Sequence, residues 1–212
     1  MSLRYQTILF DLDSTLIDNV ASFRKTLPRV GQAYPILLGQ EQLLFELLHH
    51  IPDGEAFFQG LCQRLSWEDA PAYPDFWRFY WDLYLKSTVC FPWTHAVLKE
   101  LKEKGCALGM ITNGDPDTQN AKIDAAGIRS YFDVILISQA VGFPKPDPRI
   151  YELALERLKG EKRNALFVGD NPKTDISGAK NAKIDSLFLT RGPDHYGATY
   201  VSTDIRKVLR LL

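Results

Sequence analysis

The second half of this 212-residue chain alternates short apolar runs with segments that carry a helical pattern. Such alternation is typical of a parallel sheet, because two parallel strands need a crossover connection, usually a helix, between them. The sequence therefore predicts an α/β fold whose parallel sheet is covered by helices on both faces. Strands are expected at Ala107–Ile111, Asp133–Ile137, Ala165–Val168 and Ser186–Leu189, and helices around Ile123 and at Ile150–Leu158, Ile176–Lys180 and Asp204–Leu211.

One long stretch interrupts this alternation. A first strand is expected near Ile8–Phe10, the next one comes only at residue 107, and the chain between them has a helical pattern throughout. We expect residues 1–15 and 91–212 to form a core domain and residues 16–90 a small all-α cap domain. Aromatic side chains crowd one of its helices between Phe76 and Tyr84, and they are expected in a core more than in a substrate pocket. Helices are predicted at Phe23–Val30, Gln40–His50, Gly54–Leu65, Pro74–Lys86 and Trp93–Lys104.

Two aspartates follow the first predicted strand. Asp11 and Asp13 stand where the apolar run Thr7–Phe10 gives way to a hydroxyl-bearing loop. Ligands of open α/β sheets bind at the carboxyl ends of the strands, and two carboxylates this close repel each other unless a cation or a shared proton intervenes. An acidic turn or a helix cap would be the better explanation if the pair stood alone.

A second acidic strand exit strengthens the case for a metal. The run Ala165–Val168 is followed by Gly169, where the backbone can turn sharply, and then by Asp170, with Asp175 about one helical turn further on. Carboxylate and carbonyl oxygens suit a hard divalent cation, Mg²⁺ before Zn²⁺. Helix capping by Asp170 is the alternative, but two acidic exits in one chain favour the metal.

Two further strand exits are polar in a different way. Thr112 and Asn113 follow the run Cys106–Ile111 and offer a hydroxyl and an amide, although an Asn-Gly pair is also a common turn. Lys145 lies between two prolines, and a residue before proline is restricted to extended conformations. A lysine held in this way can direct its ammonium at one point, whereas an unconstrained lysine is usually a surface residue.

In this order and spacing, the four exits resemble the motifs of the haloacid dehalogenase superfamily. The resemblance runs from Ile8 to about Asp175. It implies a Rossmann-like core, a helical cap inserted after the first motif, and a hydrolase that acts on phosphomonoesters. Asp11–Thr15 is similar to the first motif, Thr112–Asn113 to the second, Lys145 to the third, and Gly169–Asp170 with Asp175 to the fourth.

The resemblance implies catalytic and substrate-binding roles. Asp11 would attack phosphorus as a nucleophile and form an aspartyl-phosphate. Asp13 would protonate the leaving oxygen and then deprotonate the water that hydrolyses this intermediate. Thr112, Asn113 and Lys145 would bind the phosphoryl group, and Lys145 would also offset the charge of the nucleophile.

It likewise implies Mg²⁺ as the cofactor. Asp11, Asp170 and the backbone carbonyl of Asp13 would hold the ion, and Asp175 would support its water shell. A phosphate dianion repels a carboxylate nucleophile, so the attack needs the positive charge of a metal and a lysine at the same point.

Composition limits the kinds of molecule that the protein is expected to bind. A formal net charge of −1 argues against binding of a nucleic-acid polymer by general electrostatics, and residues 16–90 carry six Lys or Arg against nine Asp or Glu. A small phosphorylated metabolite fits this balance. The three cysteines, Cys62, Cys90 and Cys106, are widely spaced and indicate reduced thiols. With no run of about 20 apolar residues and no signal-peptide pattern, we expect a cytoplasmic monomer or homodimer away from membranes.

Three other functions stay open. A sugar phosphomutase of the same superfamily would keep every core motif, and only cap residues would separate it from a phosphatase. A 2-haloacid dehalogenase needs the first aspartate but neither Asp13 as acid and base nor Mg²⁺. A non-enzymatic phosphate-binding module is disfavoured because no catalytic position is lost. Among phosphatase substrates, a nucleotide monophosphate, phosphoglycolate or a sugar phosphate fits.

Overall fold

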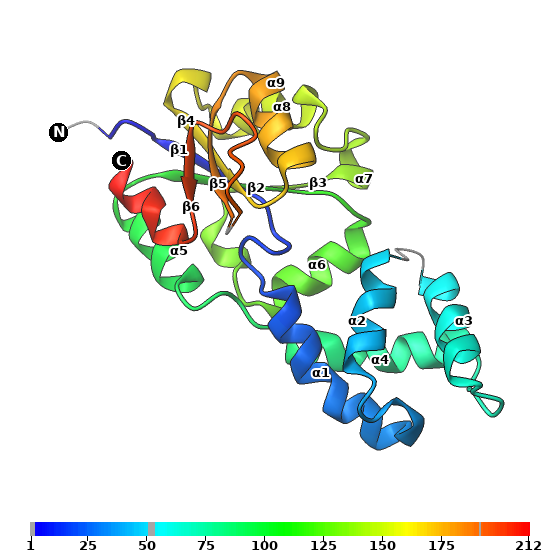
Figure 1. The fold of residues 1–212 in the computed structure, drawn as a ribbon. Helices are drawn as coiled ribbons and strands as arrows, with labels where there is room; N and C mark the ends of the chain where they lie inside the picture. The colour runs from blue at the N-terminus through cyan, green and yellow to red at the C-terminus, as the bar shows by residue number, and fades with distance from the viewer. Residues whose placement is uncertain (1–2, 51–53, 191) are drawn as a thin grey trace. The chain divides into compact units, whose positions relative to one another are not determined.

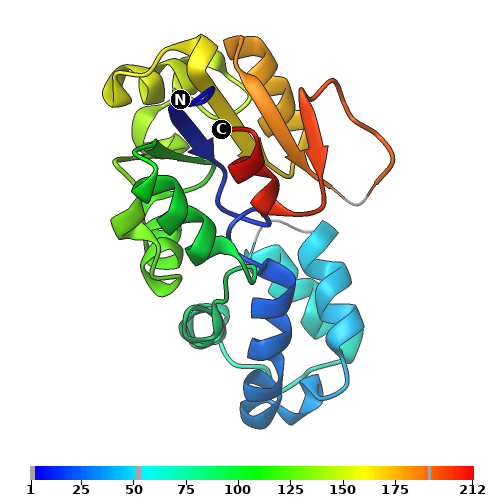
Figure 2. The same cartoon turned by 90° about the vertical axis from the view of Figure 1, so that its left-hand side faces the viewer.

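The computed structural model describes residues 3–50, 54–190 and 192–212, without the side chains of residues 48–50. The chain divides into two compact units, a larger one formed by Met1–Asp18 and Val89–Leu212 and a smaller one formed by Asn19–Thr88. Figure 1 and Figure 2 show the elements of both units from two directions. Leu16 and Ile17, which the sequence-based division assigned to the insert, are fully buried in the core of the larger unit.

The larger unit is built on one sheet of six parallel strands. These are β1 (Thr7–Phe10), β2 (Ala107–Thr112), β3 (Val134–Ile137), β4 (Ala165–Gly169), β5 (Asp185–Leu189) and β6 (Tyr200–Ser202). Across the sheet their order is β3-β2-β1-β4-β5-β6, so the carboxyl end of β1 lies between those of β2 and β4. The predicted α/β class with a parallel sheet is confirmed.

Helices lie between successive strands from β1 to β5, and a further one follows β6. The longer ones are α5 (Thr94–Glu103), α6 (Pro116–Ala125), α8 (Pro148–Leu158) and α9 (Ser177–Ala182), and α7 (Ser138–Val141) is a single turn. Short 3₁₀ helices are η2 (Arg129–Tyr131), η3 (Lys162–Asn164) and η5 (Ile205–Arg210), and η4 (Pro172–Ile176) is a π-helical turn.

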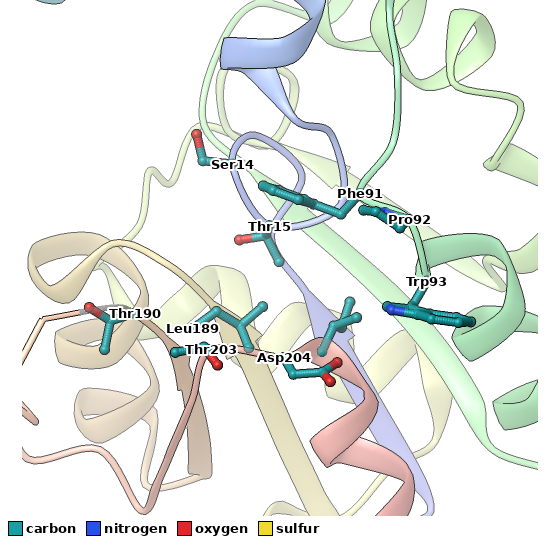
Figure 3. Close-up of a pocket in the computed structure, with 10 residues that line it drawn as sticks. Ser14, Thr15, Phe91, Pro92, Trp93, Leu189, Thr190, Thr203 and Asp204 are labelled. Atoms are coloured by element: carbon teal, nitrogen blue, oxygen red, sulfur yellow. The ribbon is translucent and has the colours of Figure 1, made fainter.

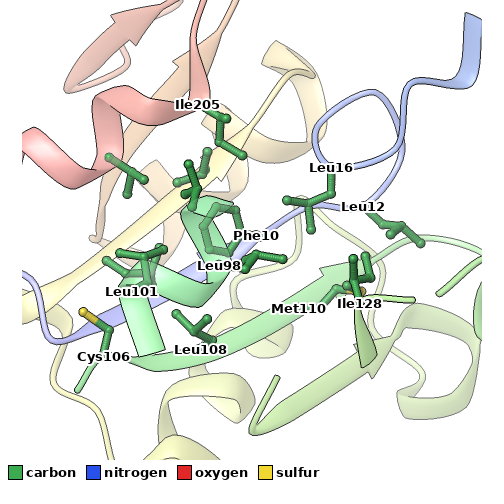
Figure 4. Packing of buried hydrophobic residues seen from close by; sticks show 14 of the residues in the cluster. Phe10, Leu12, Leu16, Leu98, Leu101, Cys106, Leu108, Met110, Ile128 and Ile205 are labelled. Atoms are coloured by element: carbon green, nitrogen blue, oxygen red, sulfur yellow. The ribbon is translucent and has the colours of Figure 1, made fainter. Parts of the chain in front are cut away.

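Alternate side chains of the central strands pack on opposite faces of the sheet. On one face, Phe10 lies in a cluster with Leu98 of α5 and Ile205 of η5, as Figure 4 shows. On the other face, Leu9 packs in a cluster with Tyr151 of α8. Neighbouring residues of a strand point to opposite sides, so the fully buried strand β1 contributes to two cores and requires helices on both faces.

The smaller unit is all-α. Its core is mainly aromatic: the rings of Phe58 and Phe76 are 4.7 Å apart, and Phe76, Tyr80 and Tyr84 repeat every four residues along one buried side of their helix. The aromatic stretch thus forms a core, as expected. The helices are α1 (Asn19–Ala33), η1 (Pro35–Leu37), α2 (Glu41–His50), α3 (Gly54–Leu65) and α4 (Tyr73–Ser87).

A π-helical turn precedes the helix predicted at Ile176–Lys180. The backbone N–H groups of Asp175 and Ile176 both donate to the Asn171 carbonyl, at 2.9 and 3.3 Å. The Asn171 side chain accepts from two further N–H groups of this turn, at 2.9 and 3.2 Å. Asp175 is therefore placed by side-chain capping, which hydrophobic periodicity does not encode.

Two elements near the carboxyl end of the chain differ from expectation. The three-residue strand Tyr200–Ser202 was not predicted, because so short a run at the edge of a sheet carries no periodic signal. The helix predicted at Asp204–Leu211 is the 3₁₀ helix η5. Its two buried apolar residues, Ile205 and Val208, are three apart, which matches three residues per turn.

The three cysteines are unpaired thiols. Burial raises the pKa of Cys90 to about 11 and also raises the pKa of Cys106, so neither is set up as a thiolate nucleophile at neutral pH. Among the described residues, no helix is long and apolar enough to cross a membrane.

Candidate active site

The residues singled out from the sequence come together at the carboxyl ends of β1, β2 and β4. A pocket of about 360 Å³ lies there. It is formed by the loop after β1, the exit of β2, the loop before α8 and the segment after β4. Its lining consists of Asp11, Asp13, Ser14, Thr112, Asn113, Lys145, Asp170, Asn171, Thr174 and Asp175.

Lys145 occupies the centre of the charged part of the pocket. Its ammonium donates to Asp11 and, at 2.8 Å, to Asp175, and it lies 5.5 Å from the centre of the Phe167 ring. The residue is only 4% exposed. Burial alone would lower the pKa of Lys145, but the two carboxylates outweigh it and raise the pKa, so the ammonium stays charged.

The carboxyl groups around it hold more negative charge than one lysine balances. Desolvation, with repulsion from Asp175, raises the pKa of Asp11 to about 7 even though Lys145 opposes the shift. Desolvation and Asp175 likewise raise the pKa of Asp170 to about 6. Such shifts mark a place where ionised carboxylates lack sufficient positive charge.

This cluster fits a divalent cation. Asp11, Asp170 and Asp175 each offer a carboxylate oxygen, and these oxygens lie within 4.8 Å of one another. The donors are all oxygens, as a hard cation prefers, and bound positive charge would stabilise the ionised carboxylates, which desolvation and mutual repulsion disfavour. Asp170 is held toward this point by the Thr15 hydroxyl, which donates to it at 3.2 Å.

Asn113 holds the backbone of Lys145. Its side-chain amide donates to the Lys145 carbonyl at 3.0 Å and accepts from the Lys145 N–H at 2.9 Å. Both polar ends of the amide are thus engaged between the exit of β2 and the loop before α8. The side chain positions the lysine, and binding of substrate by Asn113 stays a prediction.

Asp13 has different surroundings. Its Oδ2 accepts from Gln119 Nε2 at 2.9 Å, and its Oδ1 accepts from Lys122 Nζ at 2.9 Å. The same Gln119 nitrogen donates to the hydroxyl of Thr112. Asp13 therefore belongs to a hydrogen-bond network anchored on α6. Asp115 is the N-cap of this helix, and its side chain accepts from the Thr118 N–H at 2.9 Å.

The segment that carries Asp175 is packed from two sides. A methyl group on Gly169 would stand 2.6 Å from Asp175 Cγ, so only glycine leaves room for this carboxylate. The Asp175 carboxylate also accepts from the Asn171 N–H at 3.0 Å. Behind it, the Tyr151 hydroxyl donates to the carbonyls of Thr174 and Asp175, at 3.0 and 3.4 Å.

A second cavity, of about 410 Å³, adjoins the pocket at Ser14. Figure 3 shows its lining side chains, which are partly aromatic and partly hydroxyl-bearing. Thr15 lines this cavity, and its hydroxyl donates to Asp170 of the first pocket, so this hydrogen bond links the walls of the two spaces.

Sequence reasoning missed Gln119, Lys122 and Tyr151. Gln119 and Lys122 are polar residues on a helix, and such residues are usually solvated. The signal that could have found them is their spacing of three, which places both on one face of a helix that starts directly after a polar strand exit. Tyr151 carries no such signal, because it lies on a buried face like any core aromatic residue.

Known sequences resemble this chain over much of its length. A family model described as haloacid dehalogenase-like hydrolase matches residues 5–183. The phosphoserine phosphatase of Thermus thermophilus is 40% identical over 102 residues, which are 48% of this chain and 41% of that protein. The glyceraldehyde 3-phosphate phosphatase of Methanothermobacter thermautotrophicus is 30% identical over 193 residues, which are 87% of this chain and 85% of that protein.

Solved structures show the same fold. A HAD phosphatase from Thermococcus onnurineus superposes with a TM-score of 0.65 at 26% identity, covering 96% of this chain and 97% of that chain. A dehalogenase superposes with a TM-score of 0.72 at 22% identity, covering 100% and 99%, a likeness that shows the fold alone. The sheet, the motif residues and the family match define a hydrolase, and the chain belongs to the haloacid dehalogenase-like hydrolases.

Proposed function

We propose that the chain is a Mg²⁺-dependent phosphatase that hydrolyses a small phosphomonoester through an aspartyl-phosphate on Asp11. The observation that carries this proposal is the contrast between the two carboxyl groups of one loop. The Asp11 side chain is 10% exposed and paired with Lys145, whereas that of Asp13 is 29% exposed and held from α6. Two carboxyl groups in different surroundings suit two different roles, as covalent phosphoryl transfer requires.

In the first half-reaction, an Asp11 oxygen attacks phosphorus as the bond from phosphorus to the leaving oxygen breaks. Asp13 gives its proton to the leaving oxygen, so that an alcohol departs instead of an alkoxide. Lys145 offsets negative charge on the nucleophile and on the phosphoryl group, and the Thr112 hydroxyl donates to a phosphoryl oxygen.

In the second half-reaction, water attacks the phosphorus of the aspartyl-phosphate. Asp13, now a carboxylate, takes the proton of this water. The bond between phosphorus and the Asp11 oxygen breaks, which releases inorganic phosphate and restores the carboxylate.

Asp11, Asp170 and the backbone carbonyl of Asp13 would hold Mg²⁺, and Asp175 would support its water shell. A bound divalent cation supplies the positive charge that lets a carboxylate approach a phosphate dianion. The cluster of Asp11, Asp170 and Asp175 carboxylate oxygens supports a cation at this point.

The relatives support a small substrate. By their names, the two phosphatases reported above act on phosphoserine and on glyceraldehyde 3-phosphate, which are both three-carbon phosphates. We propose a phosphorylated metabolite of similar size. We further propose that the helical insert, predicted at residues 16–90 and compact as Asn19–Thr88, is a cap domain inserted after the catalytic loop. We also propose that the enzyme acts in the cytoplasm as a monomer or homodimer.

A hydrolysis screen tests the proposal. In the presence of Mg²⁺, the purified protein is expected to release inorganic phosphate from at least one two- or three-carbon phosphate, sugar phosphate or nucleotide monophosphate. A phosphomutase would convert a hexose phosphate into its isomer without net phosphate release, and a dehalogenase would release halide from a 2-haloacid. Either result, with no phosphate released from any compound, would overturn the proposed function.

A further inference from the structure

One face of α6 supplies two contacts to the Asp13 carboxylate. Gln119 and Lys122 are three residues apart, so their side chains leave the helix on the same side. Each holds a different oxygen of Asp13, at 2.9 Å in both cases. Gln119 is 2% exposed and the Lys122 side chain 15% exposed, which makes these partly desolvated contacts and not surface ion pairs.

The orientation of the Gln119 amide follows from its partners. An ionised carboxylate only accepts hydrogen bonds, so the amide nitrogen, and not the oxygen, faces Asp13. The second hydrogen of that nitrogen is directed at Thr112 Oγ1. Thr112 therefore receives a hydrogen bond from Gln119, and its own O–H remains free to donate to a third group.

The backbone before α6 leaves space for this arrangement. Gly114 has a φ of +143°, a region that favours glycine, and a methyl group there would stand 3.0 Å from Gln119 Cγ. The turn after β2 is thus shaped around the Gln119 side chain as well as around Thr112 and Asn113.

We propose that Gln119 and Lys122 are positioning residues for phosphoryl transfer. Lys122 and Gln119 fix the Asp13 carboxyl group in the orientation from which it exchanges a proton with the leaving oxygen. Gln119 also sets the polarity of Thr112, so that this hydroxyl donates to a phosphoryl oxygen. The inference rests on the proposed function and adds to it two residues outside the four sequence motifs.

Leaving-group dependence tests the Asp13 part. An alkyl phosphate needs a proton on its leaving oxygen, whereas 4-nitrophenyl phosphate releases a stable anion and needs little assistance. For Lys122→Met, kcat/KM is expected to fall by about 10–100-fold with the alkyl phosphate and by less than about 3-fold with 4-nitrophenyl phosphate. Lys122→Arg, which keeps a charged donor, should recover most of this loss.

Gln119→Leu tests the contact to Thr112 together with the contact to Asp13. This variant loses the donors to both Asp13 and Thr112, so kcat/KM should fall by about 10-fold with 4-nitrophenyl phosphate too and by more with the alkyl phosphate. The matched controls are Lys99→Met, on a lysine whose side chain is 70% exposed, and Asp117→Asn on the exposed side of α6. Both variants should leave kcat/KM unchanged with either substrate.

Equal losses with both substrates in Lys122→Met, or no loss at all, would overturn the inference. If Gln119→Leu does not fold, as judged by circular dichroism, the more exposed Lys122 variants decide the Asp13 part alone.

Crystal structures of the wild type and Lys122→Met distinguish a failure of this inference from a failure of the proposed function. If the wild type hydrolyses no phosphate ester, the proposed function is wrong. The positioning role is then tested separately, by comparing the orientation of the Asp13 side chain in the two crystal structures. A changed Asp13 rotamer in Lys122→Met supports positioning, and an unchanged one contradicts it.

Discussion

The two units of the chain bury different kinds of polar side chain. In the part of the larger unit that the structure describes, Asp11, Lys145 and Asp175 are buried as charged or titratable groups. In the smaller unit, the buried polar side chains are hydroxyls, such as that of Thr26, which donates to the Ser22 carbonyl one turn back in the same helix. All other buried side chains of the described smaller unit are apolar or aromatic.

The difference indicates what each core is for. A buried charge cluster is a weak source of stability, because desolvation offsets the attraction between its members. An apolar aromatic core stabilises a fold directly through the area that it removes from water. Substitutions should therefore affect activity and stability separately, according to the unit in which they fall.

The largest effect is expected for Asp11→Asn. Removing the nucleophile should lower kcat by at least about 10⁴-fold, which corresponds to more than about 5 kcal/mol of activation free energy. The free energy of unfolding should change by less than about 1 kcal/mol, because asparagine still accepts from Lys145 and no longer repels Asp175. Phosphate release and thermal unfolding measure the two quantities, with Asp117→Asn as the control.

Unfolding of Asp11→Asn as readily as a core truncation would contradict this separation of activity from stability. Near-normal turnover of the variant would contradict it as well, since the nucleophile would then lie elsewhere.

Phe76→Ala should lower stability, whereas Asp11→Asn should lower activity. The Phe76 side chain is 1% exposed and lies between Phe58 and Trp67, with ring centres at 4.7 and 5.9 Å. Its truncation should lower the free energy of unfolding by about 3–5 kcal/mol. Urea unfolding followed by tryptophan fluorescence measures this loss. Phe45→Ala is the matched control, because Phe45 is 45% exposed and should lose less than about 1 kcal/mol.

Removal of the divalent metal should have the next largest effect, a loss of phosphatase activity. EDTA followed by dialysis is expected to lower phosphate release by at least about 100-fold, and added Mg²⁺ should restore it. A second readout does not depend on turnover: Mg²⁺ should raise the melting temperature of the wild type, since it binds only the folded site. Asp170→Asn should lose most of this thermal shift, and full activity in excess EDTA would remove the metal from the mechanism.

The smallest effect is expected for Tyr151→Phe. The change leaves the carbonyls of Thr174 and Asp175 without the Tyr151 donor, which should lower the free energy of unfolding by about 1–2 kcal/mol. Activity should fall by less than about 10-fold, because the reacting groups remain. Tyr196→Phe, on a residue that is 58% exposed, is the control for removing a hydroxyl from a surface tyrosine.

The sequence predicted the sheet well because its strands are short apolar runs that end abruptly. Asp11 and Asp170 are recognisable for the same reason, since each follows such a run directly. The register that brings their two strands together cannot be obtained from either run alone. It depends on the pairing of Phe10 with Val168, a contact between residues far apart in the chain.

The parts that escaped prediction depend on side-chain contacts and not on periodicity. The polarity of Thr112 is set by Gln119, and the wide turn that carries Asp175 is set by the capping of Asn171. In each case the residue type is common, and only its position in space gives it a role. Periodicity identifies which face of an element is buried, but it does not say which polar group that face will meet.

The two hydrogen bonds between the Asn113 side chain and the Lys145 backbone have a consequence for the entropy of substrate binding. A lysine loses about 1.5–2 kcal/mol of rotamer freedom when its side chain becomes ordered. In this protein that loss occurs during folding, because Asn113 fixes the main chain while Asp11 and Asp175 hold the ammonium. An arriving phosphate ester therefore meets a cation that is already immobile, and its affinity is not reduced by the ordering of a flexible chain.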